Sequence, residues 1–159
     1  MTEASTALRP SEDRTWLLLV GMMMWLPAEL DARLASMARV SHVEFLVLRW
    51  LTQSVDRAIH MSSLAMAISV TPSHLTRIVT RLEKRSLVTR TSDPDDGRFT
   101  LVRLSEEGAR LVTDNEVAYV RVVRDLVFDR LGKDHVRDLD EITTSVLSHL
   151  KPECVAAIS

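Results

Sequence analysis

The apolar positions of residues 72–84 repeat with the period of an α-helix. They stand at i, i+3, i+4 and i+7, the spacing of one core-facing stripe: Leu75, Ile78, Val79 and Leu82. At about 100° per residue, the opposite face carries hydroxyl and cationic side chains, namely Ser73, Arg77, Thr80, Arg81 and Lys84. Because no acid lies on that face, the pattern predicts a helix that can contact phosphates and base edges in a DNA major groove. The alternative is an ordinary solvated basic face.

The residues before this helix predict its start and its neighbour. Thr71 suits the N-cap and Pro72 suits the first helical position. A short helix over about Ser63–Ile68 precedes it, separated by only Ser69 and Val70. Two short helices linked this tightly predict a helix-turn-helix, whose second helix enters the groove.

The pattern changes to that of strands after Leu87. Residues 88–91 and 99–104 flank the turn sequence Asp-Pro-Asp-Asp-Gly at residues 93–97. Alternating segments around such a turn predict a β-hairpin. A hairpin that directly follows a recognition helix is a wing.

The combined pattern resembles the MarR family of bacterial transcription regulators. The resemblance lies in the run LTRIVTRLEKRSLVTR followed by DPDDGR and LVRLSEEG, and helices before and after this core match the family in length and order. The family usually has glycine where this chain has Ser69 and Ser86. Those positions favour a left-handed backbone, which costs a non-glycine residue about 1 kcal/mol.

The resemblance and the exposed face together give a set of candidate DNA contacts. The resemblance implies that Arg98, at the wing tip, enters the minor groove and that Asp96 orients Arg98 through a charge-assisted hydrogen bond. Gly97 stands where many relatives have a further arginine. His74 either contacts a phosphate or is a surface residue at the helix end. The candidate contacts are Ser73, His74, Thr76, Arg77, Thr80, Arg81, Lys84 and Arg98, with Asp96 as the orienting residue.

The rest of the chain is expected to be helical. We expect a disordered N-terminus (1–10), an N-terminal dimerisation helix (11–40), a winged helix-turn-helix (41–104) and C-terminal dimerisation helices (105–159). Pro27 should kink or interrupt the first helix. Ser105 is the expected cap of a long helix, Asp134 the expected cap of the last one, and Pro152 its expected stop. The predicted fold is therefore mainly α with a small β-wing.

Surplus apolar surface at both ends of the chain indicates a partner. The run Trp16–Leu26 is apolar on all sides, more than one small domain can bury. The simplest partner is a second copy, because DNA readers of this type bind two half-sites about 34 Å apart. The expected ligand is therefore a pseudo-palindromic DNA duplex bound by a homodimer.

The charge distribution supports a nucleic-acid partner although the net charge is −2. Residues 77–103 contain seven basic and four acidic residues, a balance of +3, so the remainder carries −5. A basic patch on an acidic protein supplies phosphate contacts and limits indiscriminate binding.

A second cluster of candidate residues consists of Trp25, His42, Arg49 and Trp50. The resemblance implies that a small aromatic or phenolic ligand binds between the dimerisation helices and the winged domain and weakens DNA binding. Aromatic walls with a few polar groups suit such a ligand. The alternative is that the tryptophans belong to the core and that the regulator is independent of a ligand.

Several other classes of protein are disfavoured. The five histidines are scattered without an HExxH, CxxC or paired-carboxylate spacing, so we expect no catalysis, metal or cofactor. The chain has a single cysteine, Cys154, which suits a reducing cytoplasm. We expect it to be a free thiol, and the alternative is a redox sensor. The eleven-residue apolar run is too short to span a bilayer. A signal peptide begins with a positively charged segment, which the acidic residues Glu3, Glu12 and Asp13 do not fit.

The sequence thus predicts a cytoplasmic, dimeric transcription regulator, which we expect to be a repressor. A different class remains open: a winged-helix module that docks an acidic protein partner.

Overall fold

The computed structural model describes residues 7–158, so most of the segment expected to be disordered lies outside the described residues. The helices are α1 (Pro10–Ala38), α2 (His42–Gln53), α3 (Met61–Ala67), α4 (Pro72–Lys84), α5 (Glu106–Leu126), α6 (Lys133–Leu150) and α7 (Pro152–Ile158). The strands are β1 (Ala58–His60), β2 (Val88–Ser92) and β3 (Thr100–Leu104). The predicted fold class, mainly α with a small β-wing, is confirmed.

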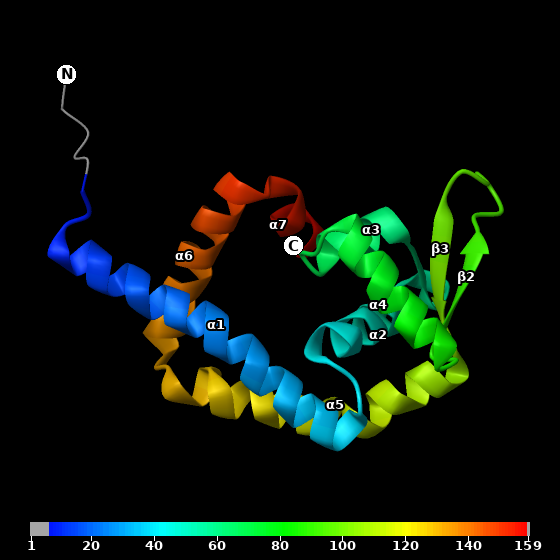
Figure 1. Ribbon diagram of the computed structural model, residues 1–159, viewed down its shortest axis with the longest axis horizontal. Coiled ribbons are helices and arrows are strands. Elements are labelled where there is room, and N and C mark those ends of the chain that lie inside the picture. The colour runs from blue at the N-terminus through cyan, green and yellow to red at the C-terminus, as the bar shows by residue number, and fades with distance from the viewer. Residues whose placement is uncertain (1–6, 159) are drawn as a thin grey trace.

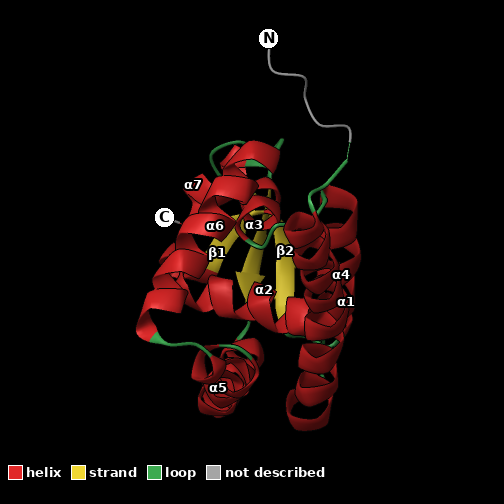
Figure 2. Ribbon diagram, turned by 90° about the vertical axis from the view of Figure 1, so that its left-hand side faces the viewer, coloured by secondary structure: helices red, strands yellow, loops and turns green. Residues whose placement is uncertain are grey.

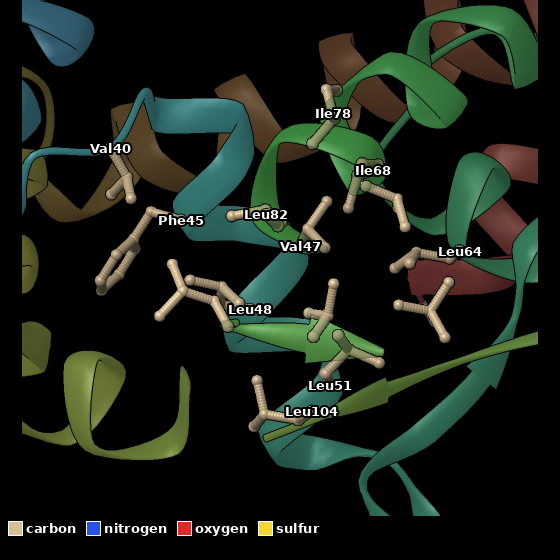
Figure 3. Packing of buried hydrophobic residues seen from close by; sticks show 14 of the residues in the cluster. Val40, Phe45, Val47, Leu48, Leu51, Leu64, Ile68, Ile78, Leu82 and Leu104 are labelled. Carbon is tan, nitrogen blue, oxygen red and sulfur yellow. The ribbon is translucent and has the colours of Figure 1, made fainter. Parts of the chain in front are cut away.

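The winged helix-turn-helix forms around one apolar core. Helices α2, α3 and α4 pack over the sheet, and the four predicted core positions of α4 are fully buried. Figure 3 shows Phe45 and Leu48 of α2 converging with Leu82 of α4 and Leu104 of β3. This core fixes the direction in which the other face of α4 points.

The sheet has one strand that the sequence pattern did not predict. Strand β1 pairs antiparallel with β3, with Ala58 opposite Arg103, so the order is β1-β3-β2 (Figure 2). With only three half-buried residues, β1 shows no alternation that would mark it as a strand. It anchors the start of α3 to the base of the wing.

Helix α1 extends away from the winged domain (Figure 1). It continues through Pro27 without an interruption, and a kink at this residue stays a prediction. Its buried residues, Leu30, Leu34 and Ala38, all lie in its last third. Most of the apolar run before them is exposed, with Trp16 at 51% and Met24 at 71%.

The C-terminal region differs from expectation at two points. Ser105 caps α5 as predicted, accepting a hydrogen bond from the Gly108 N–H at 3.0 Å. Asp134, however, lies in the first turn of α6, and the N-cap is Gly132. Pro152 follows the end of α6 but also begins α7, because proline is well suited to the first helical turn. Helix α7 returns to pack against α3, with Cys154 buried.

Both helices of the helix-turn-helix end in a left-handed residue. Ser69 has φ 55° and Ser86 has φ 58°, as the comparison with glycine at these positions predicted. The Val70 N–H donates to Ala65 O, and the Leu87 N–H donates to Leu82 O, each at 3.0 Å. These bonds are those of the Schellman helix end, which satisfies carbonyls that the helix leaves open.

Candidate nucleic-acid interface

The predicted recognition helix is α4, and its start is the predicted one. Thr71 is the N-cap, its Oγ1 accepting from the His74 N–H at 3.3 Å, and Pro72 is the first helical residue. Of the candidate contacts on α4, Thr80 is half-buried and the others are exposed: Ser73, His74, Thr76, Arg77, Arg81 and Lys84. The helix therefore presents a polar, cationic face to solvent.

The two threonines on this face are oriented by their own helix. Thr76 Oγ1 donates to Pro72 O at 2.9 Å, and Thr80 Oγ1 donates to Thr76 O at 2.8 Å. Each hydroxyl proton is thus occupied while the oxygen can still accept. Such groups match the amino groups of adenine and cytosine better than they match phosphates, which only accept.

The cationic side chains of α4 differ in whether they already have a partner. Within residues 7–158, Arg77 and Lys84 have neither a hydrogen-bond nor an ion-pair partner. Arg81, in contrast, donates from Nε to Glu44 Oε1 at 2.7 Å, while its side chain stays 53% exposed. The two free cations are the better placed to meet a partner.

The partner of Arg81 is a buried carboxylate of α2. Glu44 is 7% exposed and also accepts from the Ser41 N–H at 2.9 Å. Burial alone would raise the pKa of Glu44, but hydrogen bonds from Arg81 and Ser41 outweigh it and hold the pKa below its ordinary value. The pair fastens the recognition helix to α2. Sequence reasoning missed it because the two residues are 37 positions apart.

The wing carries the arginine–aspartate pair that the resemblance implied. Arg98 donates from Nε to Asp96 Oδ1 at 2.9 Å and from Nη2 to Asp96 Oδ2 at 2.7 Å, with its side chain 85% exposed. The hydrogen bond from Arg98 lowers the pKa of Asp96, and Asp96 raises the pKa of Arg98. The Arg98 guanidinium also lies 6.0 Å from the centre of the Phe99 ring, so Asp96 and Phe99 together fix the direction of the side chain.

The base of the wing is held by a residue outside the predicted set. His60 Nε2 lies 2.5 Å from Asp93 Oδ2, and the His60 and Phe99 rings lie 5.5 Å apart. Asp93 Oδ1 accepts from the N–H groups of Asp95 and Asp96, at 2.7 and 3.3 Å. His60 therefore supports the turn that presents Arg98. Its link to Asp93, 33 positions away, leaves no local signal in the sequence.

The four candidate ligand-binding residues are not gathered at one site. Trp25 is 77% exposed and lines an apolar pocket of about 750 Å³ between α1, α5 and α6. Trp50 packs partly buried against the core of the winged domain. Arg49 lines a different pocket and pairs with Glu116, Nε to Oε1, at 2.9 Å.

His42 and Arg49 are joined instead through Tyr119 of α5. The His42 ring stacks on Tyr119 at 6.0 Å, and the Arg49 guanidinium lies 5.7 Å from the centre of the same ring. The His42 N–H also donates to Asp31 Oδ1 of α1 at 2.7 Å. Burial lowers the pKa of His42, with Asp31 acting in the opposite direction. This cluster connects three helices, and sequence reasoning had not included Tyr119.

Two other kinds of site are absent from the part of the chain that the structure describes. No group of three or more histidine, cysteine, aspartate or glutamate side chains is arranged to hold a metal ion. Among the same residues, no helix has the length and apolar character needed to cross a membrane.

Comparisons with known proteins agree with this geometry. Residues 40–100 match the model of the MarR family. An uncharacterised HTH-type transcriptional regulator of Bacillus subtilis, YhbI, is 31% identical over 86 residues, which are 54% of this chain and only 55% of that protein. The chain thus spans about half the length of this curated relative.

Solved structures extend the match over nearly the whole chain. Sco3205, a MarR family regulator from Streptomyces coelicolor in complex with DNA, superposes with a TM-score of 0.90 at 31% identity, covering 95% of this chain and 94% of that one. AbsC from the same organism has a TM-score of 0.87 at 24% identity, covering 93% and 99%. The chain therefore belongs to the MarR family, whose members are transcription regulators and not enzymes.

Proposed function

We propose that this protein is a homodimeric repressor that acts in the cytoplasm and binds a pseudo-palindromic DNA duplex. The observation that carries the proposal is the exposed face of α4, where Arg77 and Lys84 are unpaired among the described residues and no acid is exposed. In this proposal α4 lies in the major groove, and Arg98 of the wing enters the neighbouring minor groove. The DNA complex of Sco3205 supports the DNA-binding role.

The dimer is proposed from the unburied apolar surface of the terminal helices. No residue of α6 is buried, and its apolar residues Ile142, Val146 and Leu150 are 53–64% exposed. On α1, Leu17 is 61% exposed. An apolar surface of this extent is unusual on a monomer. A second copy would cover it and would also supply the second recognition helix that two half-sites require.

We further propose that a small aromatic ligand would act at the apolar pocket beside Trp25. This pocket joins α1 to the end of α5 and to α6, with Leu126, Leu139 and Ile142 in its wall. A ligand bound there would favour one spacing of the two recognition helices over another, and so would shift the population away from the DNA-bound form. Effector and DNA would then weaken each other's binding by the same factor.

Fluorescence anisotropy with two labelled duplexes tests the DNA-binding proposal. One duplex carries the region upstream of the protein's own gene, and the other has random sequence of equal length. We expect Arg77→Ala to weaken binding to the first more than to the second, because one base contact is worth about 1–3 kcal/mol of discrimination. Arg124→Ala is the matched control, since Arg124 lies on α5 and pairs with Asp129.

The outcome also separates the alternatives. A wild-type protein that binds neither duplex, at any salt concentration, would exclude a DNA reader and favour a protein-docking module. For the ligand, tryptophan fluorescence is titrated with benzoates and phenols while DNA release is followed. If no compound both changes the emission and releases DNA, the regulator is independent of such ligands.

A further inference from the structure

A pocket lies between the recognition helix and the wing, and the candidate contacts Thr76 and Arg98 form part of its wall. Its volume is about 410 Å³. The polar residues that line it come from β1, α3, α4, β2 and the wing: His60, Ser62, Thr76, Arg90, Arg98 and Thr100. We call it the helix–wing pocket. Figure 1 shows α4 and the β2–β3 hairpin side by side, and residues of both line the pocket.

The wall of this pocket has cations but no carboxylate. Arg90 and Arg98 both line it, whereas none of its lining residues is an aspartate or glutamate. The acids that pair with these cations, Glu83 and Asp96, are not among the lining residues. An anion that enters the pocket therefore meets guanidinium groups without first meeting a negative side chain.

Arg90 is held in place before any ligand arrives. Its Nε and Nη2 donate to Glu83 Oε2 at 3.1 and 2.5 Å, and its backbone N–H donates to Glu83 Oε1 at 3.3 Å. Nη1 has no partner among the described residues. A guanidinium pinned on one edge loses little freedom when its other edge binds an anion. Ser62, also without a hydrogen-bond partner in residues 7–158, adds a neutral donor to the same wall.

The location of the pocket indicates which anion it receives. When a helix lies in a major groove and the adjoining wing lies in the neighbouring minor groove, one sugar-phosphate strand separates the two grooves. That strand must pass between the helix and the wing, which is where the helix–wing pocket lies.

We propose that the helix–wing pocket binds one backbone phosphate of duplex DNA and that Arg90 is its principal cation. This inference rests on the proposed DNA-binding function and adds to it a residue outside the face of α4. The contact is to the backbone and carries no sequence information, so it sets the register of the protein on the duplex.

Salt dependence of binding tests the proposal directly. The logarithm of the binding constant falls with log salt by about 0.9 per neutralised phosphate. Arg90→Gln should therefore lower this slope by about 0.9 and weaken binding about eightfold at 0.1 M salt, equally for the upstream and the random duplex. Arg90→Lys retains the charge and should restore the wild-type slope. Arg124→Gln, which removes a paired cation from α5, should leave the slope unchanged.

The possible outcomes separate this inference from the function on which it rests. A wild-type protein that binds no duplex contradicts the proposed function itself. If the wild-type protein binds and Arg90→Gln keeps the same slope, Arg90 contacts no phosphate and the inference is wrong. It is also wrong if Arg90→Gln weakens only the upstream duplex, because Arg90 would then read a base. If Arg90→Gln and Arg90→Lys both lower the slope of binding against log salt, Arg90 only supports the fold and the inference is wrong.

Discussion

Replacing Ser86 by glycine should stabilise the protein. Ser86 has a left-handed backbone with φ 58° at the end of α4, and within the described residues its hydroxyl makes no hydrogen bond. Its carbonyl accepts from Ser105 Oγ at 2.7 Å, and glycine retains that carbonyl. Ser86→Gly therefore removes a strained Cβ without removing a contact.

The magnitude follows from two opposing effects. A side chain at a left-handed position costs about 1–2 kcal/mol, which glycine avoids. Glycine also gives the unfolded chain more freedom, which costs about 0.4–1 kcal/mol on folding. At the middle of both ranges, the net gain in the free energy of unfolding is about 0.8 kcal/mol. Ser69→Gly should give a gain of the same size, since Ser69 has φ 55° at the end of α3.

Urea unfolding at one fixed protein concentration measures the effect. We expect the midpoint to rise while the slope of the free energy against urea stays constant. Ser63→Gly is the matched control, because it makes the same chemical change inside α3. There the helical backbone favours serine, and stability should fall by about 0.5 kcal/mol. If Ser86→Gly lowers stability as Ser63→Gly does, the left-handed residue is not strained and the reasoning is wrong.

Four further predictions concern packing, charge, assembly and the wing. Gly108→Ala should cost about 1–3 kcal/mol in urea unfolding, since its new Cβ would lie 2.3 Å from a backbone oxygen; unchanged stability would show that α5 shifts freely. Glu44→Gln should cost about 1–2 kcal/mol at pH 7. The folded-state pKa of Glu44 is depressed, so the stabilisation by its carboxylate is fully present above the unfolded-state pKa and is lost as the pH falls through the folded-state pKa. The free energies of unfolding of the wild type and of Glu44→Gln should therefore converge in acid. Leu19→Glu combined with Met23→Glu should yield monomer or aggregate in sedimentation, and a stable wild-type monomer would contradict the dimer. Arg98→Ala should weaken binding to all duplexes in anisotropy with the fold intact; unchanged affinity would remove Arg98 from the interface.

Features encoded locally could be predicted from the sequence. The N-cap of α4 follows from Thr71 and Pro72, and the buried stripe follows from the helical period. The pair of Asp96 and Arg98 was expected because the two residues lie in one turn and match a family pattern. Each of these features depends on neighbours within a few positions along the chain.

Features that join distant segments could not be predicted in the same way. The ion pair of Arg81 with Glu44 and the contact of His42 with Tyr119 span 37 and 77 positions. Such pairs depend on how α2 packs against α4 and α5, and periodicity does not report that packing. The same limit explains why the candidate ligand-binding residues are not gathered at one site. Trp25 of α1 lines the apolar pocket, whereas Trp50 of α2 packs against the core of the winged domain.

The return of α7 to α3 gives the winged domain a third attachment. The chain enters this domain from α1 and leaves it through α5, and the α7–α3 contact adds a non-covalent tether. A body held at three points cannot swing about one hinge unless one attachment yields. A motion that shifts the winged domain relative to α6 within one protomer must therefore slide or detach α7. A bulky fusion placed after α7 would press on this tether, whereas one placed ahead of α1, whose first turn lies far from α7 in Figure 1, would leave it alone.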